Sequence, residues 1–232
     1  YDQSINNPEN FWQDVSSDVF WFKKPTKILD KSKPPFYKWF SDGVTNTCYN
    51  ALDLHIDKGK GQKTALIYDS PITGNKSKFT YEELKAKVSK FAGGLKDQGV
   101  NKGDRVIIYM PMIPEAVIAM LACARIGAIH SVVFGGFASD ELASRIDDST
   151  AKILVTASCG FELGRTVEYK PLVDEALKKA KNKIEKLILF QRKGHEVKLN
   201  SSNELDWQEV VSKAKDVDCV EMNSNELAYI LY

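Results

Sequence analysis

Two segments of the sequence combine glycine with residues suited to binding an anion. The first is the run Phe134-Gly135-Gly136-Phe137, which follows an apolar stretch and precedes a helix-like one. Adjacent glycines permit positive φ and let a ligand approach the backbone closely. A helix capped by Ser139 would present free N–H groups and a partial positive charge, which suit a phosphate. A tight packing turn is the alternative interpretation of these glycines.

The second segment is the run Cys159-Gly160-Phe161-Glu162-Leu163-Gly164-Arg165. An arginine beside a glycine, in a loop that leaves a strand, suits bidentate phosphate binding. Two unit charges about 4 Å apart gain about 4 kcal/mol at an effective dielectric of roughly 20, before desolvation. That energy is enough to position an anion. A surface ion pair of Arg165 with Glu162 or Glu168 is the alternative interpretation.

The sequence offers no group suited to catalysis and no metal site. None of the histidines His55, His130 and His195 has a Ser, Cys or carboxylate partner at a recognisable spacing. His130 lies in an apolar stretch typical of a buried strand. Neither a nucleophile elbow nor a Walker loop is present. The cysteines lack metal-ligand spacing, which predicts buried thiols in a reducing compartment; they are Cys48, Cys123, Cys159 and Cys219.

Alternating strand-like and helix-like segments would position both glycine segments at strand ends. Apolar runs predict strands at residues 64–68, 105–110, 129–133, 153–156, 186–190 and 228–232. Helices are predicted from Thr80, with a capping box completed by Glu83, from Pro114, from Ser139, and over residues 171–181. Helix-length crossovers indicate an α/β fold with a mainly parallel sheet. Ligands of such sheets bind outside the carboxyl ends of the strands.

The first 60 residues differ in composition from the rest. They are rich in aromatic side chains and are interrupted by Pro25, Pro34 and Pro35. We expect an arm of short helices and extended pieces, pinned to a larger body by its bulky side chains. An independent small domain is the alternative. A helix over residues 48–57, capped by Asn46 or Thr45, is expected to end the arm, so the chain divides into residues 1–60 and 61–232.

Charge and hydropathy argue against two classes of partner. The net charge of +1 provides no electrostatic footprint for nucleic acid. The most apolar stretch, residues 116–137, is interrupted by Arg125, His130 and glycines, so it predicts a buried helix and strand and not membrane insertion. The lysine-rich run over residues 178–186 is typical of a solvated helix face.

Several motifs together resemble those of adenylate-forming enzymes, and specifically of the AMP-forming short-chain acyl-CoA synthetases. Three runs in the body carry the resemblance: Lys102-Gly103-Asp104-Arg105-Val106, Tyr109-Met110-Pro111-Met112-Ile113-Pro114-Glu115-Ala116 and Ala124-Arg125-Ile126-Gly127-Ala128-Ile129-His130-Ser131-Val132-Val133-Phe134-Gly135-Gly136-Phe137. The arm is similar to the subfamily's N-terminal signature at Trp39-Phe40, Gly43, Asn46-Thr47-Cys48-Tyr49-Asn50 and Asp53-Leu54-His55. The resemblance covers nearly the whole chain. It implies the N-terminal part of the large domain of such an enzyme.

The loop over residues 162–165 resembles that of propionyl-CoA synthetases more than that of acetyl-CoA synthetases. Acetyl-CoA synthetases usually carry two arginines three positions apart there, whereas here Glu162 replaces the first and Arg165 keeps the second. Propionyl-type enzymes typically read Glu-Pro-Gly-Arg, and Leu163 departs from that pattern. The resemblance implies that Arg165 binds a phosphate of coenzyme A. The other residues implied to contact coenzyme A are Glu162, Leu163 and Gly164, with Phe134, Gly135 and Gly136 lining the same nucleotide end.

The implied reaction uses ATP, coenzyme A and Mg²⁺ to convert propionate, or alternatively acetate, to acyl-CoA, AMP and diphosphate through an acyl-adenylate. The family's Thr/Ser/Gly-rich phosphate loop normally follows a strand like residues 229–232. The phosphate loop, the acyl pocket and the catalytic lysine of the C-terminal domain are therefore expected outside this chain, which alone would be inactive. The expected location is the cytoplasm or the mitochondrial matrix. A longer-chain ligase and a stand-alone nucleotide-binding or interaction module are the competing hypotheses.

Overall fold

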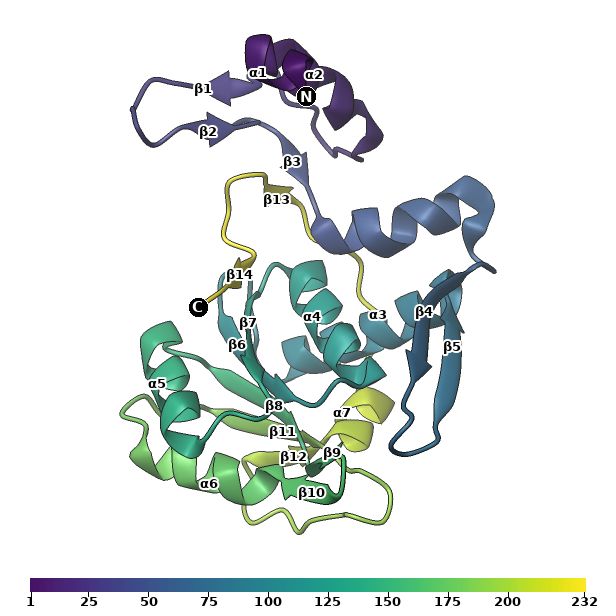
Figure 1. Ribbon diagram of the computed structural model, residues 1–232, viewed down its shortest axis with the longest axis vertical. Helices are drawn as coiled ribbons and strands as arrows, with labels where there is room; N and C mark the ends of the chain where they lie inside the picture. Colours follow the sequence, from purple (N-terminus) through teal and green to yellow (C-terminus); the bar gives the residue numbers. More distant parts are fainter.

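Six parallel strands form the central sheet of the computed structural model, which describes residues 1–232 (Figure 1). The strand order is β12-β11-β8-β6-β7-β14, and every neighbouring pair is parallel. The strands are β6 (Arg105–Met110), β7 (Ile129–Phe134), β8 (Ile153–Ala157), β11 (Lys186–Phe190), β12 (Glu204–Asp206) and β14 (Tyr229–Ile230). The predicted α/β class is confirmed. Because β7 and β8 lie on opposite sides of β6, the strand order reverses there, which is where ligands of such sheets bind.

Helices cover both faces of this sheet. They are α3 (Tyr81–Asp97), α4 (Pro114–Ile126), α5 (Ser139–Ser149), α6 (Tyr169–Lys179) and α7 (Trp207–Lys213). Alternate residues of β6 point to opposite faces: Val106 and Ile108 pack in a core with α3, α4 and α7, whereas Ile107 and Tyr109 pack in a second core with α5 and α6. A strand buried on both faces explains the continuous apolar run in the sequence.

Most of the predicted helix signals are present in the structure. The Thr80 side chain accepts from the Glu83 amide and Glu83 reciprocates, so the capping box is confirmed. Pro114 opens α4, and Gly127 ends it with a φ of 71°. The prediction that Ser139 caps α5 is wrong, because Ser139 is already helical and Ala138 occupies the cap position. The Ser139 hydroxyl instead accepts a hydrogen bond from Lys179 at 3.1 Å.

Two antiparallel hairpins were not predicted from the sequence. The predicted strand over residues 64–68 is present as β4 (Thr64–Asp69), but it pairs with β5 (Lys76–Thr80) in a separate antiparallel sheet. The second hairpin joins β9 (Cys159–Glu162) to β10 (Arg165–Glu168) and follows β8 directly. Both turns lie where they can contribute to a site at the carboxyl ends of the central strands.

The N-terminal arm contains α1 (Asp2–Asn6), α2 (Pro8–Val15), η1 (Ser16–Asp18), β1 (Leu29–Asp30), β2 (Lys38–Trp39) and β3 (Val44–Thr45). It lies beyond one end of the central sheet (Figure 1). The helix expected next is formed by the π-helical turns η2 (Tyr49–Asp53) and η3 (Ile56–Lys60), and Asn46 caps it by accepting from the Tyr49 amide at 3.1 Å. No helix in the structure has both the length and the apolar character needed to span a membrane.

The attachment of the arm differs from the expectation that bulky side chains pin it to the body. None of the arm's aromatic side chains is buried, and they contact mainly one another, as Trp12 does with Trp39. Polar contacts connect the arm to the body: β3 pairs with β13 (Met222–Asn223), and the Asn46 amide group donates to the carbonyls of Ala124 and Val220, both at 2.9 Å. Hydrogen bonds therefore hold the arm, together with two small buried side chains, Cys48 and Leu52, which pack in the core beside α3 and α4.

Candidate functional site

The run Phe134-Gly135-Gly136-Phe137 forms a tight turn at the end of β7. The Phe137 amide donates to the Phe134 carbonyl at 3.0 Å, and the Phe137 carbonyl accepts from the Tyr109 hydroxyl at 2.8 Å. Neither glycine has a positive φ. Gly135 is needed for space and not for backbone conformation, because an added Cβ atom would clash with the Tyr169 side chain. Gly136 faces only the Phe134 ring, which is 69% exposed and packs against Phe137.

Tyr169 joins the two glycine segments predicted from the sequence. A Cβ atom added to Gly135 would lie 2.2 Å from the Tyr169 hydroxyl, and one added to Gly160 would lie 2.8 Å from it. The Tyr169 backbone amide donates to the Ser158 carbonyl at 3.0 Å, which fixes the start of α6 beside β8. Burial raises the pKa of Tyr169 to about 12, so the phenol stays neutral at physiological pH. The packing-turn interpretation therefore describes Gly135 correctly.

A cleft of about 340 Å³ lies at the carboxyl ends of the central strands. Both sequence segments contribute to its wall, through Phe134, Gly135, Gly136, Gly160, Phe161 and Glu162. The remaining wall comes from Tyr169, Arg192, the segment over residues 110–113, residues 132–133 and the β4–β5 turn over residues 68–73. Part of the site predicted from the sequence is thus brought together at one place, as the topological rule for such sheets requires.

The other predicted site residues lie outside this cleft. Leu163 and Gly164 form the two-residue turn of the β9–β10 hairpin; Gly164 has a φ of 76° and the Leu163 side chain is 92% exposed. Arg165 forms an ion pair with Glu162, with Nη2 at 2.6 Å and Nε at 2.7 Å from Oε2. The structure therefore contains the ion pair that was the alternative interpretation of Arg165.

Arg192 is a cleft residue that the sequence analysis missed. It follows β11 by two positions, and its guanidinium lies over the Phe161 ring, 4.7 Å from the ring centroid. The start of α5, which the sequence suggested as a phosphate site, does not line the cleft and carries Asp140 and Glu141 in its first turn. The signal for Arg192 in the sequence is its position just beyond the carboxyl end of β11, because ligands of such sheets bind beyond the carboxyl ends of the strands.

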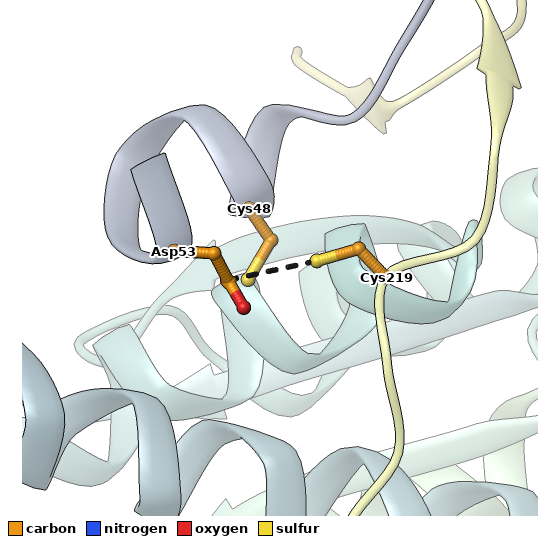
Figure 2. Close-up of side chains that lie close together, drawn as sticks. All are labelled: Cys48, Asp53 and Cys219. Atoms are coloured by element: carbon orange, nitrogen blue, oxygen red, sulfur yellow. Dashed lines mark hydrogen bonds between the residues drawn. The ribbon is translucent and has the colours of Figure 1, made fainter. Parts of the chain in front are cut away.

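A buried polar cluster lies away from the cleft, between the arm and the body (Figure 2). Side-chain atoms of Cys48, Asp53 and Cys219 all lie within 4.8 Å of one another. Arg125 Nη1 is 2.8 Å from Asp53 Oδ2, 3.1 Å from Cys219 Sγ and 3.6 Å from Cys48 Sγ. Lys85 contacts the other Asp53 oxygen at 3.0 Å. Arg125 and Lys85 already place two positive charges around the single Asp53 carboxylate, which disfavours a further cation there, and the Asp53–Arg125 pair joins the arm to the body.

The charges and hydrogen bonds of this cluster shift the pKa values of Asp53 and Cys48. Burial raises the pKa of Asp53, but hydrogen bonds from Arg125 and Lys85 outweigh that effect and hold this pKa below its usual value. A hydrogen bond from Cys219 is the main cause that lowers the pKa of the Cys48 thiol. The expectation of buried thiols holds for Cys48, Cys123 and Cys159, and Cys219 is partly exposed.

Comparison with known protein families matches the fold and the motifs to one class of enzyme. The profile of the AMP-binding enzyme family matches residues 55–232, and that of the acetyl-coenzyme A synthetase N-terminus matches residues 1–51. The chain belongs to the AMP-binding enzyme family. The resemblance stated from the sequence motifs is therefore confirmed.

Individual relatives are short-chain acyl-CoA synthetases. The chain is 52% identical, over 99% of its length, to human acyl-CoA synthetase short-chain family member 3, mitochondrial, and covers 34% of that protein. It is 46% identical, over 91% of its length, to acetyl-coenzyme A synthetase from Streptomyces coelicolor, and covers 32% of that protein. The chain thus spans about a third of the length of these relatives.

The same fold is seen in the solved structure of acetoacetyl-CoA synthetase from Streptomyces lividans. The TM-score is 0.87 at 23% sequence identity, and the match covers 99% of this chain and 35% of that one. The central sheet and its crossover helices therefore have the same fold as the corresponding part of that synthetase.

Proposed function

We propose that this chain forms the N-terminal portion of an AMP-forming acyl-CoA synthetase that acts on propionate or another short-chain carboxylate. The carboxylate would attack the α-phosphate of ATP to give an acyl-adenylate and diphosphate, and the thiol of coenzyme A would then displace AMP. The main support is the identity of 52% over 99% of the chain with a short-chain acyl-CoA synthetase. Residues outside this chain would carry the adenylation chemistry and hold Mg²⁺.

The role proposed for this chain's cleft is to admit coenzyme A. The cleft is lined by the exposed ring of Phe134, by glycine backbone and by the cationic side chain of Arg192. Such a wall fits the phosphorylated adenosine end of coenzyme A, because purine rings stack on aromatic faces and guanidinium groups bind phosphates. Glu162, Leu163, Gly164 and Arg165 would contact the same ligand from the rim of the cleft once Arg165 exchanges its Glu162 partner for a phosphate.

Propionate is preferred to acetate in this proposal because of the rim loop. Glu162 occupies the position at which acetyl-CoA synthetases usually carry the first of two arginines, and here it accepts from Arg165. We further propose that residues 1–60 act as an arm and residues 61–232 as the first part of the AMP-binding domain, a division close to the boundary between the two family profiles at residues 51 and 55. The mitochondrial matrix is the proposed location, with the cytoplasm as the alternative, because a 52% identical relative is mitochondrial.

The direct test is product formation by the full-length protein that contains this chain. Purified enzyme with ATP, Mg²⁺, coenzyme A and propionate should release AMP and diphosphate and form propionyl-CoA, measured by chromatography. Parallel reactions with acetate and butyrate rank the carboxylates by kcat/KM. Turnover of acetate above propionate would correct the substrate preference. Absence of acyl-CoA with every short carboxylate would reject the function.

A further inference from the structure

The charges that line the cleft are not balanced. Its wall contains two carboxylates, Asp69 and Glu162, and one arginine, Arg192. Each carboxylate has a cation of its own outside the wall: Lys76 lies 2.8 Å from Asp69, and Arg165 lies 2.6 Å from Glu162. Arg192 has no carboxylate within ion-pair distance, and its guanidinium donates no hydrogen bond within the chain. The cleft therefore presents one positive charge without a partner.

We propose that Arg192 is the anion-binding residue of this cleft and that it binds a phosphate group at the nucleotide end of coenzyme A. The inference rests on the proposed function, and it assigns a residue that the resemblance to the family does not assign. Arg192 is 9% exposed as a residue, but none of its guanidinium nitrogens is sealed from solvent, so they can reach a ligand in the cleft. A phosphate in the cleft would supply the countercharge and the hydrogen-bond acceptors that the guanidinium lacks within the chain.

Neighbouring residues hold Arg192 in position for this contact. Its backbone amide donates to the Ser158 hydroxyl at 2.9 Å, which ties it to the end of β8. Phe161 lies between two side chains: the Arg192 guanidinium is 4.7 Å from its centroid, and the His195 ring packs edge-on at 5.0 Å. Stacking fixes the plane of the guanidinium while leaving its N–H groups free to donate. The arginine is thus ordered before a ligand arrives, which lowers the entropic cost of binding.

Two other charged side chains need to be considered: Arg165 could bind the phosphate instead of Arg192, and Glu115 could neutralise Arg192. The geometry argues against both. Arg165 is already paired, its side chain is 70% exposed, and it does not line the cleft. Glu115, at the start of α4, is influenced by the charge of Arg192 but forms no ion pair with it, and burial raises the pKa of Glu115. Arg165 would therefore add affinity at the rim, whereas Arg192 would provide the main countercharge inside.

The test compares Arg192→Met and Arg192→Lys with the wild type in the full-length enzyme. Methionine keeps an unbranched apolar stem over Phe161 and removes the charge; lysine keeps the charge and removes the planar fork. Loss of a charged hydrogen bond to phosphate predicts a rise in the KM for coenzyme A of about 10- to 100-fold in Arg192→Met, and of roughly 3- to 10-fold in Arg192→Lys. The KM values for ATP and carboxylate should stay within about twofold of wild type.

A matched control is available at the next position. Lys193 has the same charge, is exposed and does not line the cleft, so Lys193→Met should leave the KM for coenzyme A unchanged.

Dephospho-coenzyme A, which lacks the 3′-phosphate, shows which phosphate of coenzyme A Arg192 binds. If Arg192 binds the 3′-phosphate, Arg192→Met no longer discriminates coenzyme A from its dephospho form. If it binds the diphosphate, both ligands weaken equally. Either result supports the assignment.

The proposal is overturned if Arg192→Met and Arg192→Lys leave the KM for coenzyme A within twofold of wild type, or if the KM for ATP rises by as much. Calorimetric titration of coenzyme A into the wild type and both variants repeats the comparison without turnover. If the wild-type enzyme makes acyl-CoA and both variants bind coenzyme A normally, the role of Arg192 is refuted and the proposed function stands. A wild type that neither binds coenzyme A nor makes acyl-CoA refutes the proposed function as well.

Discussion

The hydroxyl of Tyr169 fills the space that a side chain at Gly135 would need, since a Cβ atom on Gly135 would lie 2.2 Å from it. The same Cβ atom would also lie 3.1 Å from the Met110 carbonyl, so the turn has little room to relax. This contact sets the distance between the end of β7 and the start of α6, and with it the shape of one wall of the cleft.

We expect Gly135→Ala to destabilise the protein by about 1–3 kcal/mol, because the added methyl group overpacks a closed space. Denaturant unfolding measures the loss. Tyr169→Phe in the same chain removes the nearest atom and should recover part of it. Gly136→Ala is the matched control: its Cβ atom would meet only the ring of the exposed Phe134, which can turn away. An equal loss in both glycine variants would contradict the role given to Tyr169.

Asp53→Ala is expected to cost about 3–5 kcal/mol, since it leaves the fully buried Arg125 without its carboxylate. The exposed fraction of the Arg125 side chain is 1%, so solvent cannot replace the missing partner. Lys76→Ala breaks the surface pair with Asp69, whose side chains are 74% and 50% exposed, and should cost less than about 1 kcal/mol. Thermal unfolding of the two variants compares the pairs. Similar losses would show that burial does not control the strength of the Asp53–Arg125 pair.

We expect the protonation of His130 to lower the free energy of unfolding in mild acid. Burial lowers its pKa from 6.5 to about 4, so the folded state binds this proton less readily than the unfolded state does. Its stabilising contribution is complete above pH 6.5 and is lost as the pH falls toward 4, with a total change of about 3 kcal/mol at most. His130→Gln should flatten the stability profile in this window. A wild-type profile that is flat between pH 4 and 6.5 would exclude this role.

Arg165→Ala should raise the KM for coenzyme A several-fold more than the KM for ATP in the full-length enzyme. The substitution removes a cation from the rim and leaves the charge of Glu162 uncompensated beside the cleft. Glu162→Gln should act in the opposite direction, because it releases Arg165 from its ion pair. Stability should change by less than about 1 kcal/mol in both variants, since the pair is exposed. Parallel shifts in the KM values for ATP and coenzyme A would argue against a contact with coenzyme A.

Local signals explain why the central sheet could be predicted from the sequence. Pro114 and Gly127 mark the two ends of α4, and the apolar strands β6 and β11 have the predicted bounds. These features depend on residues a few positions apart. The β4–β5 hairpin was missed because its second strand, with the sequence KSKFT, is polar and exposed at alternate positions, so no apolar run announces it.

The composition of the cleft depends on contacts that no local pattern contains. The Phe134–Phe137 turn was identified because its glycines are adjacent, but its neighbour Tyr169 lies beyond one further helix, α5, and three further strands, β8 to β10. Arg192 looked like an ordinary charged residue after a strand. The cluster of Cys48, Asp53 and Cys219 brings together the arm and a segment near residue 220. Spacing along the chain predicted the elements, and only their packing shows which side chains meet.

The pairing of β3 with β13 has a consequence for synthesis on the ribosome. The arm is translated first, yet its partner strand at Met222–Asn223 emerges almost at the end of this chain. Until then the arm can contact the body through the Asn46–Ala124 hydrogen bond and the Asp53–Arg125 ion pair, but it lacks its partner strand, and the thiol of Cys48 lacks its neighbour Cys219. Contacts between such distant positions form late and lengthen the exposure of apolar surface. We therefore expect the arm to complete its docking only after the segment over residues 219–223 has been synthesised.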